Sequence, residues 1–199
     1  MRAVVFDIGG VLLDWDPRYL YRSLIADPAE IERFLAEVCT GAFNAELDAG
    51  RPFDDACAEL SARHPDHVEL IRAWSRQDEM IGGEIAGTAA LVERLAESGV
   101  ELYLLTNMPT DVFAARRARY PVLQRFAGAL VSGAEGVLKP EAEIYRRTID
   151  RFGLTPTETL FVDDKPGNVE AAEALGLVGH QFVDAPTLED ALRDLGFLR

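Results

Sequence analysis

Regular alternation of apolar runs and helical segments limits the possible folds of this chain more than any other feature. Short apolar runs bounded by turn residues are typical of buried parallel strands. Such strands are expected at 2–7, 100–106, 128–132, 159–163 and 178–183. Helices are expected at about 88–98, 110–120, 141–152 and 166–175, with a short helix at the C-terminus. Strands separated by helices build βαβ units, so the sequence predicts an α/β fold with a Rossmann-like parallel sheet core.

The segment between the first strand and the remaining strands has a helical pattern. Asp16-Pro17 and Asp27-Pro28 each place an N-cap residue before a proline at the first helical position. Apolar residues then recur at the spacing of one helix face, first at Ile31, Phe34, Leu35 and Val38, and later at Phe53, Ala56, Cys57 and Leu60. A last helix is expected from Pro65 to Met80, and Gly82-Gly83 then breaks the pattern as a candidate hinge. We therefore expect a helical cap at 16–83, inserted into a discontinuous core at 1–15 and 84–199.

Composition narrows the classes of partner. The chain has 199 residues and a formal net charge of −14, so it would be repelled by nucleic-acid phosphates and anionic membranes, and neither is expected as a partner. No apolar stretch reaches the roughly 18 residues of a membrane span, and no signal-peptide core precedes the first strand. Cys39 and Cys57 fit neither a disulfide framework nor a zinc pattern, and Cys57 has the spacing of a core residue. A cytoplasmic monomer or small homo-oligomer is expected.

Carboxylates stand at the ends of two predicted strands. Asp7 follows the apolar run at 3–6, and Asp163-Asp164 follows the run at 160–162. In open α/β sheets, ligands bind beyond the carboxyl ends of the strands, so the three carboxylates are expected at one edge. Carboxylates packed together repel one another and need a cation, and hard oxygen ligands suit Mg²⁺. The sequence therefore predicts a magnesium site at this edge.

Four short stretches fall at or just beyond strand ends: Asp7 to Gly10, Thr106-Asn107, Lys139-Pro140, and Asp163-Asp164 with Asn168. In this order and placement they resemble the motifs of the haloacid dehalogenase-like hydrolase superfamily, and the resemblance covers the full chain. The FDIGGVL, DWDP and VDDKPGN segments resemble its bacterial sugar-phosphate phosphatase branch. That branch includes α-D-glucose-1-phosphate phosphatases and is akin to the N-terminal phosphatase domain of soluble epoxide hydrolases. The resemblance implies a Mg²⁺-dependent phosphatase that hydrolyses small phosphorylated metabolites, sugar phosphates above all, through an aspartyl-phosphate.

The resemblance also implies which residues bind and attack the phosphate. Asp7 is expected to be the nucleophile, and a carboxylate on a rigid strand end suits the formation of an aspartyl-phosphate. The Thr106 hydroxyl and the backbone N–H of Asn107 are expected to bind the phosphate. Lys139 is expected to neutralise the phosphate and Asp7, and its role as a compact point charge fits a chain whose other basic residues, apart from Lys165, are arginines.

The expected metal ligands are Asp7, Asp164 and the backbone carbonyl of Gly9. Asp163 is expected to support the metal through water or a neighbouring ligand, or to act only as an N-cap. Asn168 is expected to hold Asp164 or Lys139 in place. Three carboxylates are then balanced by one Mg²⁺ and one lysine, so the substrate meets a neutral site.

Gly9 departs from the family pattern. Most phosphatases of this superfamily carry a second aspartate two residues after the nucleophile as general acid and base, and this chain has Gly9 there. General acid catalysis is typically worth about 10²–10⁴-fold, which corresponds to roughly 3–5 kcal/mol. Either Asp14 or Asp16 replaces the missing acid, or the substrates have easily displaced leaving groups, as anomeric sugar phosphates do. We favour the second hypothesis.

Substrate specificity is expected to come from the cap as it closes over the site. Candidates for substrate contact are Trp15, Phe43, Asn44 and Asp48. Two other activities remain open: a 2-haloacid dehalogenase with the same Asp nucleophile, and a phosphometabolite-binding protein without turnover. A phosphotransferase is less favoured, because it would need the acid and base that Gly9 cannot supply.

Overall fold

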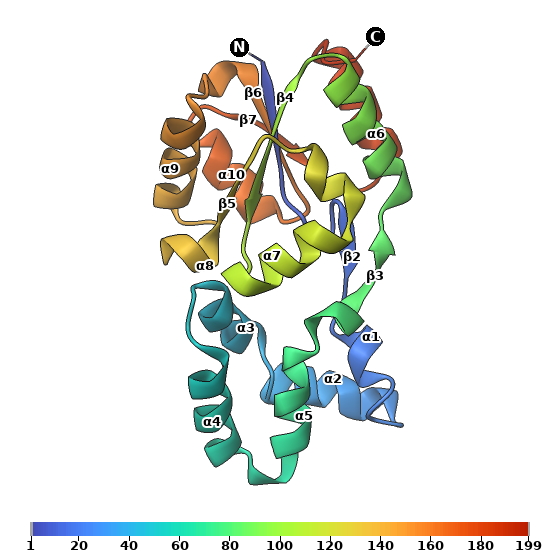
Figure 1. Cartoon of the computed structure of the whole chain (residues 1–199), viewed down its shortest axis with the longest axis vertical. Coiled ribbons are helices and arrows are strands. Elements are labelled where there is room, and N and C mark those ends of the chain that lie inside the picture. Colours follow the sequence, from blue (N-terminus) through green and yellow to red (C-terminus); the bar gives the residue numbers. More distant parts are fainter. Residues whose placement is uncertain (1, 199) are drawn as a thin grey trace.

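The computed structural model describes residues 2–198. Within them lies a parallel sheet of five strands in the order β5-β4-β1-β6-β7 (Figure 1). The strands are β1 (Ala3–Phe6), β4 (Glu101–Thr106), β5 (Gly128–Val131), β6 (Thr159–Asp163) and β7 (Val178–Gln181). Each strand expected from the sequence is present, and β1 occupies the middle of the sheet. The predicted α/β fold with a Rossmann-like parallel sheet is confirmed.

Helices cover both faces of this sheet. α6 (Ala86–Glu97) and α11 (Ala185–Asp194) form one apolar cluster with Val4 and Phe6 of β1. α9 (Ala142–Phe152) and α10 (Pro166–Glu173) form another with Ala3 and Val5. Successive side chains of a strand point to opposite faces, so β1 is apolar throughout because both its faces are covered. The remaining helices of this part are α7 (Thr110–Arg119), α8 (Ser132–Glu135), η4 (Pro121–Arg125) and η5 (Pro156–Glu158).

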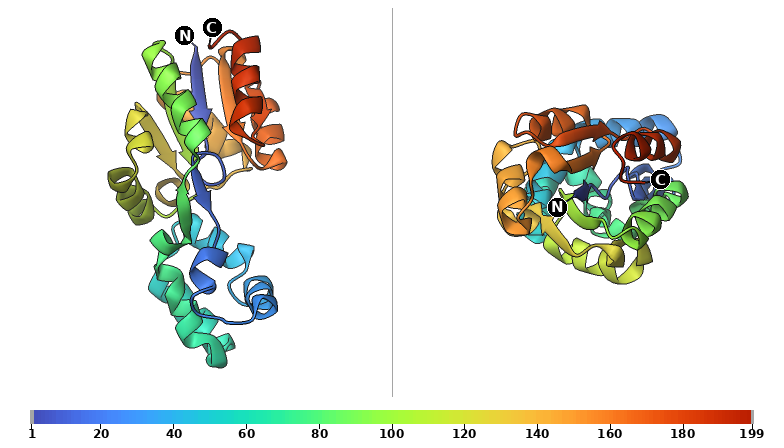
Figure 2. Two further views of the ribbon diagram at one scale, coloured as in Figure 1. Left: turned by 90° about the vertical axis from the view of Figure 1, so that its right-hand side faces the viewer. Right: turned by 90° about the horizontal axis from the view of Figure 1, so that it is seen from above.

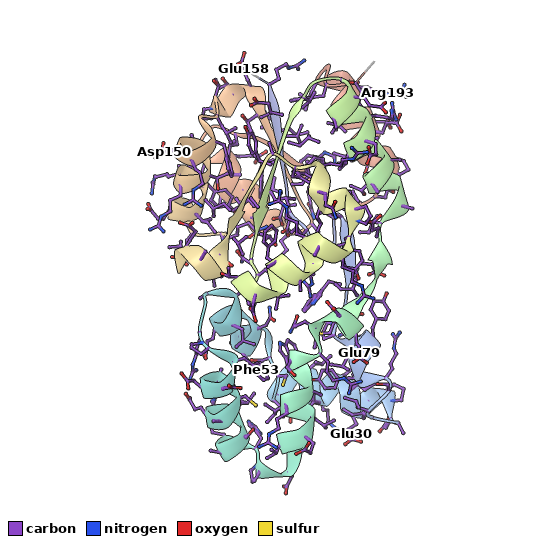
Figure 3. The ribbon with its side chains drawn as sticks, viewed as in Figure 1. Glu30, Phe53, Glu79, Asp150, Glu158 and Arg193 are labelled. Atoms are coloured by element: carbon purple, nitrogen blue, oxygen red, sulfur yellow. The ribbon has the colours of Figure 1, made fainter. Side chains whose placement is uncertain are left out.

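A second group of helices lies beyond the carboxyl ends of the strands (Figures 1 and 2). It contains α1 (Arg18–Tyr21), α2 (Pro28–Glu37), α3 (Gly41–Asp48), α4 (Phe53–Arg63) and α5 (Val68–Arg72). These helices share a separate apolar core that includes Tyr21, Trp74 and both cysteines. Figure 3 shows the side chains of Glu30, Phe53 and Glu79 in this part, and those of Asp150, Glu158 and Arg193 around the sheet. We refer to residues 16–83 as the cap.

Two antiparallel strands, β2 (Leu13–Trp15) and β3 (Ile81–Glu84), connect the two parts. Gly82 and Gly83 both lie in this paired strand β3, and the hinge expected there stays a prediction. Gly82 permits this pairing, since a Cβ there would lie 2.5 Å from Asp14 Oδ2. The predicted boundaries at residues 15 and 84 stay a proposal, because this two-stranded sheet belongs to both parts.

The continuous helix expected from Pro65 to Met80 is wrong. The chain forms four short pieces there: η1 (Pro65–His67), α5, η2 (Ala73–Ser75) and η3 (Gln77–Met80). The backbone of Arg76, with φ −80° and ψ 49°, lies outside the helical region and breaks the run. This break lets Trp74 and Met80 both reach the core of the cap, where they are 2% and 0% exposed. Across residues 2–198, none of the helices combines the length and the apolar composition needed to cross a membrane.

Candidate active site

Asp7 and Asp163 lie side by side at the carboxyl ends of β1 and β6. Phe6 pairs with Val162 in the sheet, and the Asp7 N–H donates to the Val162 carbonyl at 2.9 Å. Asp164 follows directly, and oxygen atoms of the three carboxylates lie within 4.8 Å of one another. The structure therefore brings together the carboxylates that the sequence placed at one edge of the sheet.

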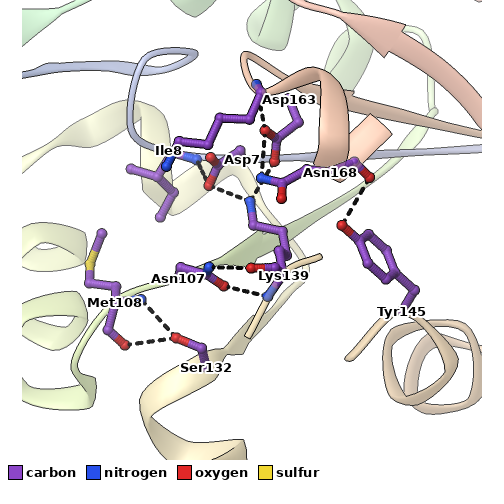
Figure 4. Close-up of polar contacts among 10 residues, drawn as sticks. Asp7, Ile8, Asn107, Met108, Ser132, Lys139, Tyr145, Asp163 and Asn168 are labelled. Carbon is purple, nitrogen blue, oxygen red and sulfur yellow. Dashed lines mark hydrogen bonds and ion pairs between the residues drawn. The ribbon is translucent and has the colours of Figure 1, made fainter. Parts of the chain in front are cut away.

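Lys139 lies between two of these carboxylates (Figure 4). Its Nζ is 2.9 Å from Asp7 Oδ1 and 2.6 Å from Asp163 Oδ2. Burial disfavours the charge of Lys139, but Asp7 and Asp163 outweigh this effect and raise its pKa. Burial also raises the pKa of Asp7 to about 6, while Lys139 opposes the rise and Asp163 adds to it. Lys139 thus neutralises the charge of both Asp7 and Asp163, whereas the sequence predicted this role for Asp7 alone.

Asn107 holds the backbone of Lys139. Its Nδ2 donates to the Lys139 carbonyl and its Oδ1 accepts from the Lys139 N–H, both at 2.9 Å. The two bonds join the end of β4 to the loop that carries the lysine. This role of the Asn107 side chain was missed, because nothing near residue 107 in the sequence indicates which distant loop it meets.

Asp163 has both carboxylate oxygens engaged. Besides the Lys139 ion pair at Oδ2, its Oδ1 accepts from Asn168 Nδ2 and from the Lys165 N–H, each at 2.9 Å. Asn168 was expected to hold Asp164 or Lys139, and this expectation is wrong, because its side chain donates to Asp163. The Tyr145 hydroxyl in turn donates to the Asn168 carbonyl at 2.9 Å (Figure 4). Asp163 therefore orients Lys139, and both of its carboxylate oxygens already accept hydrogen bonds.

Asp164 fits the donor set of a divalent cation. Its Oδ1 is buried and has no hydrogen-bond partner within residues 2–198. Burial, and then Asp163, raise the pKa of Asp164, so a cation beside it would offset an unfavourable charge. Gly10 lies against it with φ +74°, and a Cβ there would be 2.8 Å from Asp164 Oδ2. Buried carboxylate oxygens of Asp7 and Asp164 with the adjacent Gly9 carbonyl are ligands of the kind that Mg²⁺ prefers.

A cavity of about 570 Å³ joins these residues to the cap. From the core it is lined by Asp7, Thr106 and Lys139, and from the cap side by Trp15, Asn44 and Asp48. Three of the four candidates for substrate contact therefore lie on the cavity wall. Phe43 does not, because its ring packs on Trp74 in the core of the cap, 5.7 Å between centroids.

Besides Asp7 and Lys139, two further ionisable groups on the cavity wall are buried. Arg116 of α7 is 3% exposed, and its guanidinium donates to the Gln77 carbonyl at 3.4 Å and to Gln77 Oε1 at 3.3 Å. Asp48 of α3 is 9% exposed, and its Oδ2 accepts from Asn44 Nδ2 at 2.8 Å. Burial raises the pKa of Asp48 to about 7, while Lys165 and Arg116 oppose the rise. No local pattern in the sequence indicates that either side chain is buried.

The two acids proposed to replace the one missing at Gly9 are engaged elsewhere. Asp14 Oδ2 accepts from the Tyr19 hydroxyl at 2.6 Å, and Asp16 Oδ1 accepts from the Arg18 N–H at 2.8 Å. Neither lines the cavity described above. Gly9 itself has room for a side chain, because a Cβ there would lie 3.9 Å from Trp15 Cβ.

The fold and these motifs define a family. The model of the haloacid dehalogenase-like hydrolases matches residues 1–176, and the chain belongs to this family. It is therefore a hydrolase, and phosphatases are among its relatives. Sesquiterpene phosphatase astK of Aspergillus oryzae is 30% identical over 195 residues, which cover 98% of this chain and 96% of that protein.

Solved structures share the fold over nearly the whole chain. A predicted HAD-like family hydrolase from Porphyromonas gingivalis has a TM-score of 0.73 at 26% identity, covering 97% of this chain and 98% of that one. The HAD family enzyme bt-2542 from Bacteroides thetaiotaomicron, in complex with magnesium and inorganic phosphate, has a TM-score of 0.69 at 18% identity. It covers 92% of this chain and 95% of its own. The second likeness concerns the fold alone.

Proposed function

We propose that this protein is a Mg²⁺-dependent phosphomonoesterase in which Asp7 forms an aspartyl-phosphate. The observation that carries the proposal is the difference in hydrogen bonding between the two oxygens of the Asp7 carboxylate. Its Oδ1 is held by the Ile8 N–H at 2.7 Å and by Lys139, whereas Oδ2 has no hydrogen-bond donor within residues 2–198. One oxygen is thus fixed in place while the other is free to attack phosphorus or to bind a cation.

In this proposal each residue at the strand ends has one task. The Thr106 hydroxyl and the Asn107 N–H bind the phosphate, and Lys139 neutralises it together with Asp7. Asp7, Asp164 and the Gly9 carbonyl would hold Mg²⁺, which supplies positive charge against the carboxylates and the phosphate. The magnesium and phosphate bound by the Bacteroides enzyme of the same fold are consistent with this assignment.

The reaction then proceeds in two displacements. Asp7 attacks phosphorus, the bond from phosphorus to the ester oxygen breaks, and that oxygen takes up a proton and leaves as an alcohol. Water next attacks the phosphorus of the aspartyl-phosphate, inorganic phosphate leaves, and Asp7 returns as a carboxylate. The cap limits access of bulk water to this site while the substrate is bound.

Two classes of substrate are candidates. Sugar phosphates, with anomeric phosphates favoured, are the class that the sequence motifs indicate. Phosphate esters with an apolar body are the second, supported by the Trp15, Leu35 and Trp74 side chains on the cavity wall and by the sesquiterpene phosphatase among the relatives. Both classes place the phosphate against Asp7 and differ only in what contacts the cap.

Phosphate release from a substrate panel tests the proposal. The panel contains α-D-glucose 1-phosphate, glucose 6-phosphate and farnesyl phosphate, each with Mg²⁺ or with EDTA, beside an Asp7→Asn control. We expect Mg²⁺-dependent release that the control abolishes. Equal rates with the two glucose phosphates would contradict the preference for anomeric phosphates, and faster release from farnesyl phosphate would favour the apolar class.

Two further assays test the remaining alternatives. Chloride release from 2-chloropropionate in EDTA, with every phosphate ester untouched, would support a dehalogenase instead. Tight Mg²⁺-dependent binding of a phosphate ester without any release would support a binding protein.

A further inference from the structure

The geometry points to Asp48 as the residue that supplies the acid and base missing at Gly9. On the proposed phosphatase function, on which this inference rests, the Asp48 carboxyl donates a proton to the leaving ester oxygen and later accepts one from the attacking water. Among the described residues of the cap, Asp48 is the buried carboxyl on the cavity wall, whereas Asp7 and Asp164 line the cavity from the core.

The direction of the reaction favours a group on the cap. In phosphoryl transfer, the attacking and leaving oxygens lie roughly in line with phosphorus. Since Asp7 attacks from the end of β1, the leaving oxygen lies on the far side of phosphorus, toward the cap. Asp48 and Asn44 of α3 line the same cavity from that side.

The position of Asp48 is fixed by contacts between the cap and the core. The Ser132 hydroxyl donates to the Asp48 carbonyl at 2.6 Å and accepts from the Met108 N–H at 2.9 Å, which ties α3 to the ends of β4 and β5. Gly50, with φ +94°, lets the chain approach closely, because a Cβ there would lie 2.6 Å from the Gly133 carbonyl oxygen. A backbone held in this way is suited to a catalytic residue.

The side chain is partly anchored and partly free. Asn44 Nδ2 holds Oδ2, and within residues 2–198 the structure gives Oδ1 no hydrogen-bond partner. Four charged groups from four core segments face Asp48. Lys165, Arg116 and Lys139 stabilise the negative charge of its carboxylate, and Asp7 disfavours that charge. Burial outweighs them and sets its pKa at about 7, where a carboxyl can both donate and accept a proton near neutrality.

Protons balance over the two displacements. In the first, the bond from phosphorus to the ester oxygen breaks, and that oxygen takes the Asp48 proton and leaves as an alcohol. In the second, the Asp48 carboxylate takes a proton from the water that attacks phosphorus. The bond from phosphorus to Asp7 breaks, phosphate leaves, and the protonated Asp48 is restored.

A comparison of two esters tests this assignment. p-Nitrophenyl phosphate has a leaving group that needs no proton, whereas 2-phenylethyl phosphate, of similar size, needs one. For Asp48→Asn with Mg²⁺, we expect kcat/KM to fall about 10²–10⁴-fold on 2-phenylethyl phosphate and to change little on p-nitrophenyl phosphate. With p-nitrophenyl phosphate, Asp48→Asn should give a burst of p-nitrophenol, because hydrolysis of the aspartyl-phosphate has lost its general base. The same change at the exposed Asp55 of α4, outside the cavity, serves as control and should alter neither ester.

The pH profile gives a readout that a structural role would not move. Wild-type kcat/KM on 2-phenylethyl phosphate should fall as the pH rises through about 7, because the acid form of Asp48 is lost, and Asp48→Asn should lack this fall. An equal loss on both esters, a rise in KM alone, or no change would overturn the assignment. Absence of Mg²⁺-dependent release by the wild-type protein from either ester would instead overturn the proposed function.

Discussion

Replacing Asp48 by Asn should change how the stability of the protein depends on pH. The Asp48 carboxyl is 9% exposed, and its pKa is about 7 in the folded chain against an ordinary value of 3.8, because burial disfavours its charge. An asparagine of the same shape can still accept the hydrogen bond from Asn44, and it carries no ionisable group. The two proteins therefore differ mainly by the titration of this one carboxyl.

The sign and size follow from the two pKa values. A carboxyl with a raised folded-state pKa contributes stability that is fully present below about pH 3.8 and lost as the pH rises to about 7. The difference of about 3 pKa units corresponds to about 4 kcal/mol at 1.36 kcal/mol per unit. Between pH 5 and pH 8, where the measurement is practical, about 3 kcal/mol of this loss is expected.

Urea unfolding of both proteins at several pH values measures the effect. EDTA is kept throughout, because a cation beside Asp7 would add a pH dependence of its own. The free energy of unfolding of Asp48→Asn, relative to wild type, should rise by about 3 kcal/mol from pH 5 to pH 8, with equal m-values. Asp55→Asn should run parallel to wild type, since Asp55 is exposed. A constant difference between Asp48→Asn and wild type across this range would show that burial does not raise the pKa of Asp48.

Three further substitutions test the site. Lys139→Met should lower the free energy of unfolding by about 3–5 kcal/mol and abolish phosphate release, since Asp7 and Asp163 lose their buried partner. The stability control is Lys165→Met, which should change the free energy of unfolding little because Lys165 is exposed. Gly10→Ala should weaken Mg²⁺ binding about 10–100-fold in calorimetry, because the added Cβ would lie 2.8 Å from Asp164 Oδ2. Gly9→Ala should leave the Mg²⁺ affinity unchanged, because a Cβ there would lie 3.9 Å from Trp15 Cβ. Equal affinities in this pair would contradict the assignment of Asp164. Ser132→Ala should cost about 1–3 kcal/mol in urea unfolding, since the Met108 N–H and the Asp48 carbonyl lose their partner; an unchanged stability would show that this tie does not hold the cap to the core.

The sheet and the placement of its catalytic candidates were predictable because they depend on local patterns. An apolar run between turn residues identifies a buried strand, and the residue after it lies at the edge of the sheet. Asp7, Thr106 and Asp163 could therefore be assigned to one edge without knowledge of any contact between distant segments. The family resemblance added the expected roles, which the structure leaves as proposals.

The remaining features depend on packing between segments far apart in the chain. Asn107 and Lys139 meet only once β4 and the loop after β5 are in place, and Asn168 faces Asp163 because α10 begins directly after β6. The buried state of Asp48 arises where α3 docks at Ser132, and no pattern near residue 48 indicates that contact. The helix expected from Pro65 to Met80 fails for a similar reason, since burial of Trp74 overrides the local helical preference.

A search for a phosphoryl group on Asp7 tests the proposed aspartyl-phosphate directly. Protein mixed with p-nitrophenyl phosphate and Mg²⁺ is quenched with acid over the first turnover, and the peptide that contains Asp7 is analysed by mass spectrometry. We expect this peptide to gain the mass of one phosphoryl group as p-nitrophenol appears, and Asp7→Asn to show neither. Turnover with the phosphoryl group on another residue, or undiminished turnover by Asp7→Asn, would contradict this expectation.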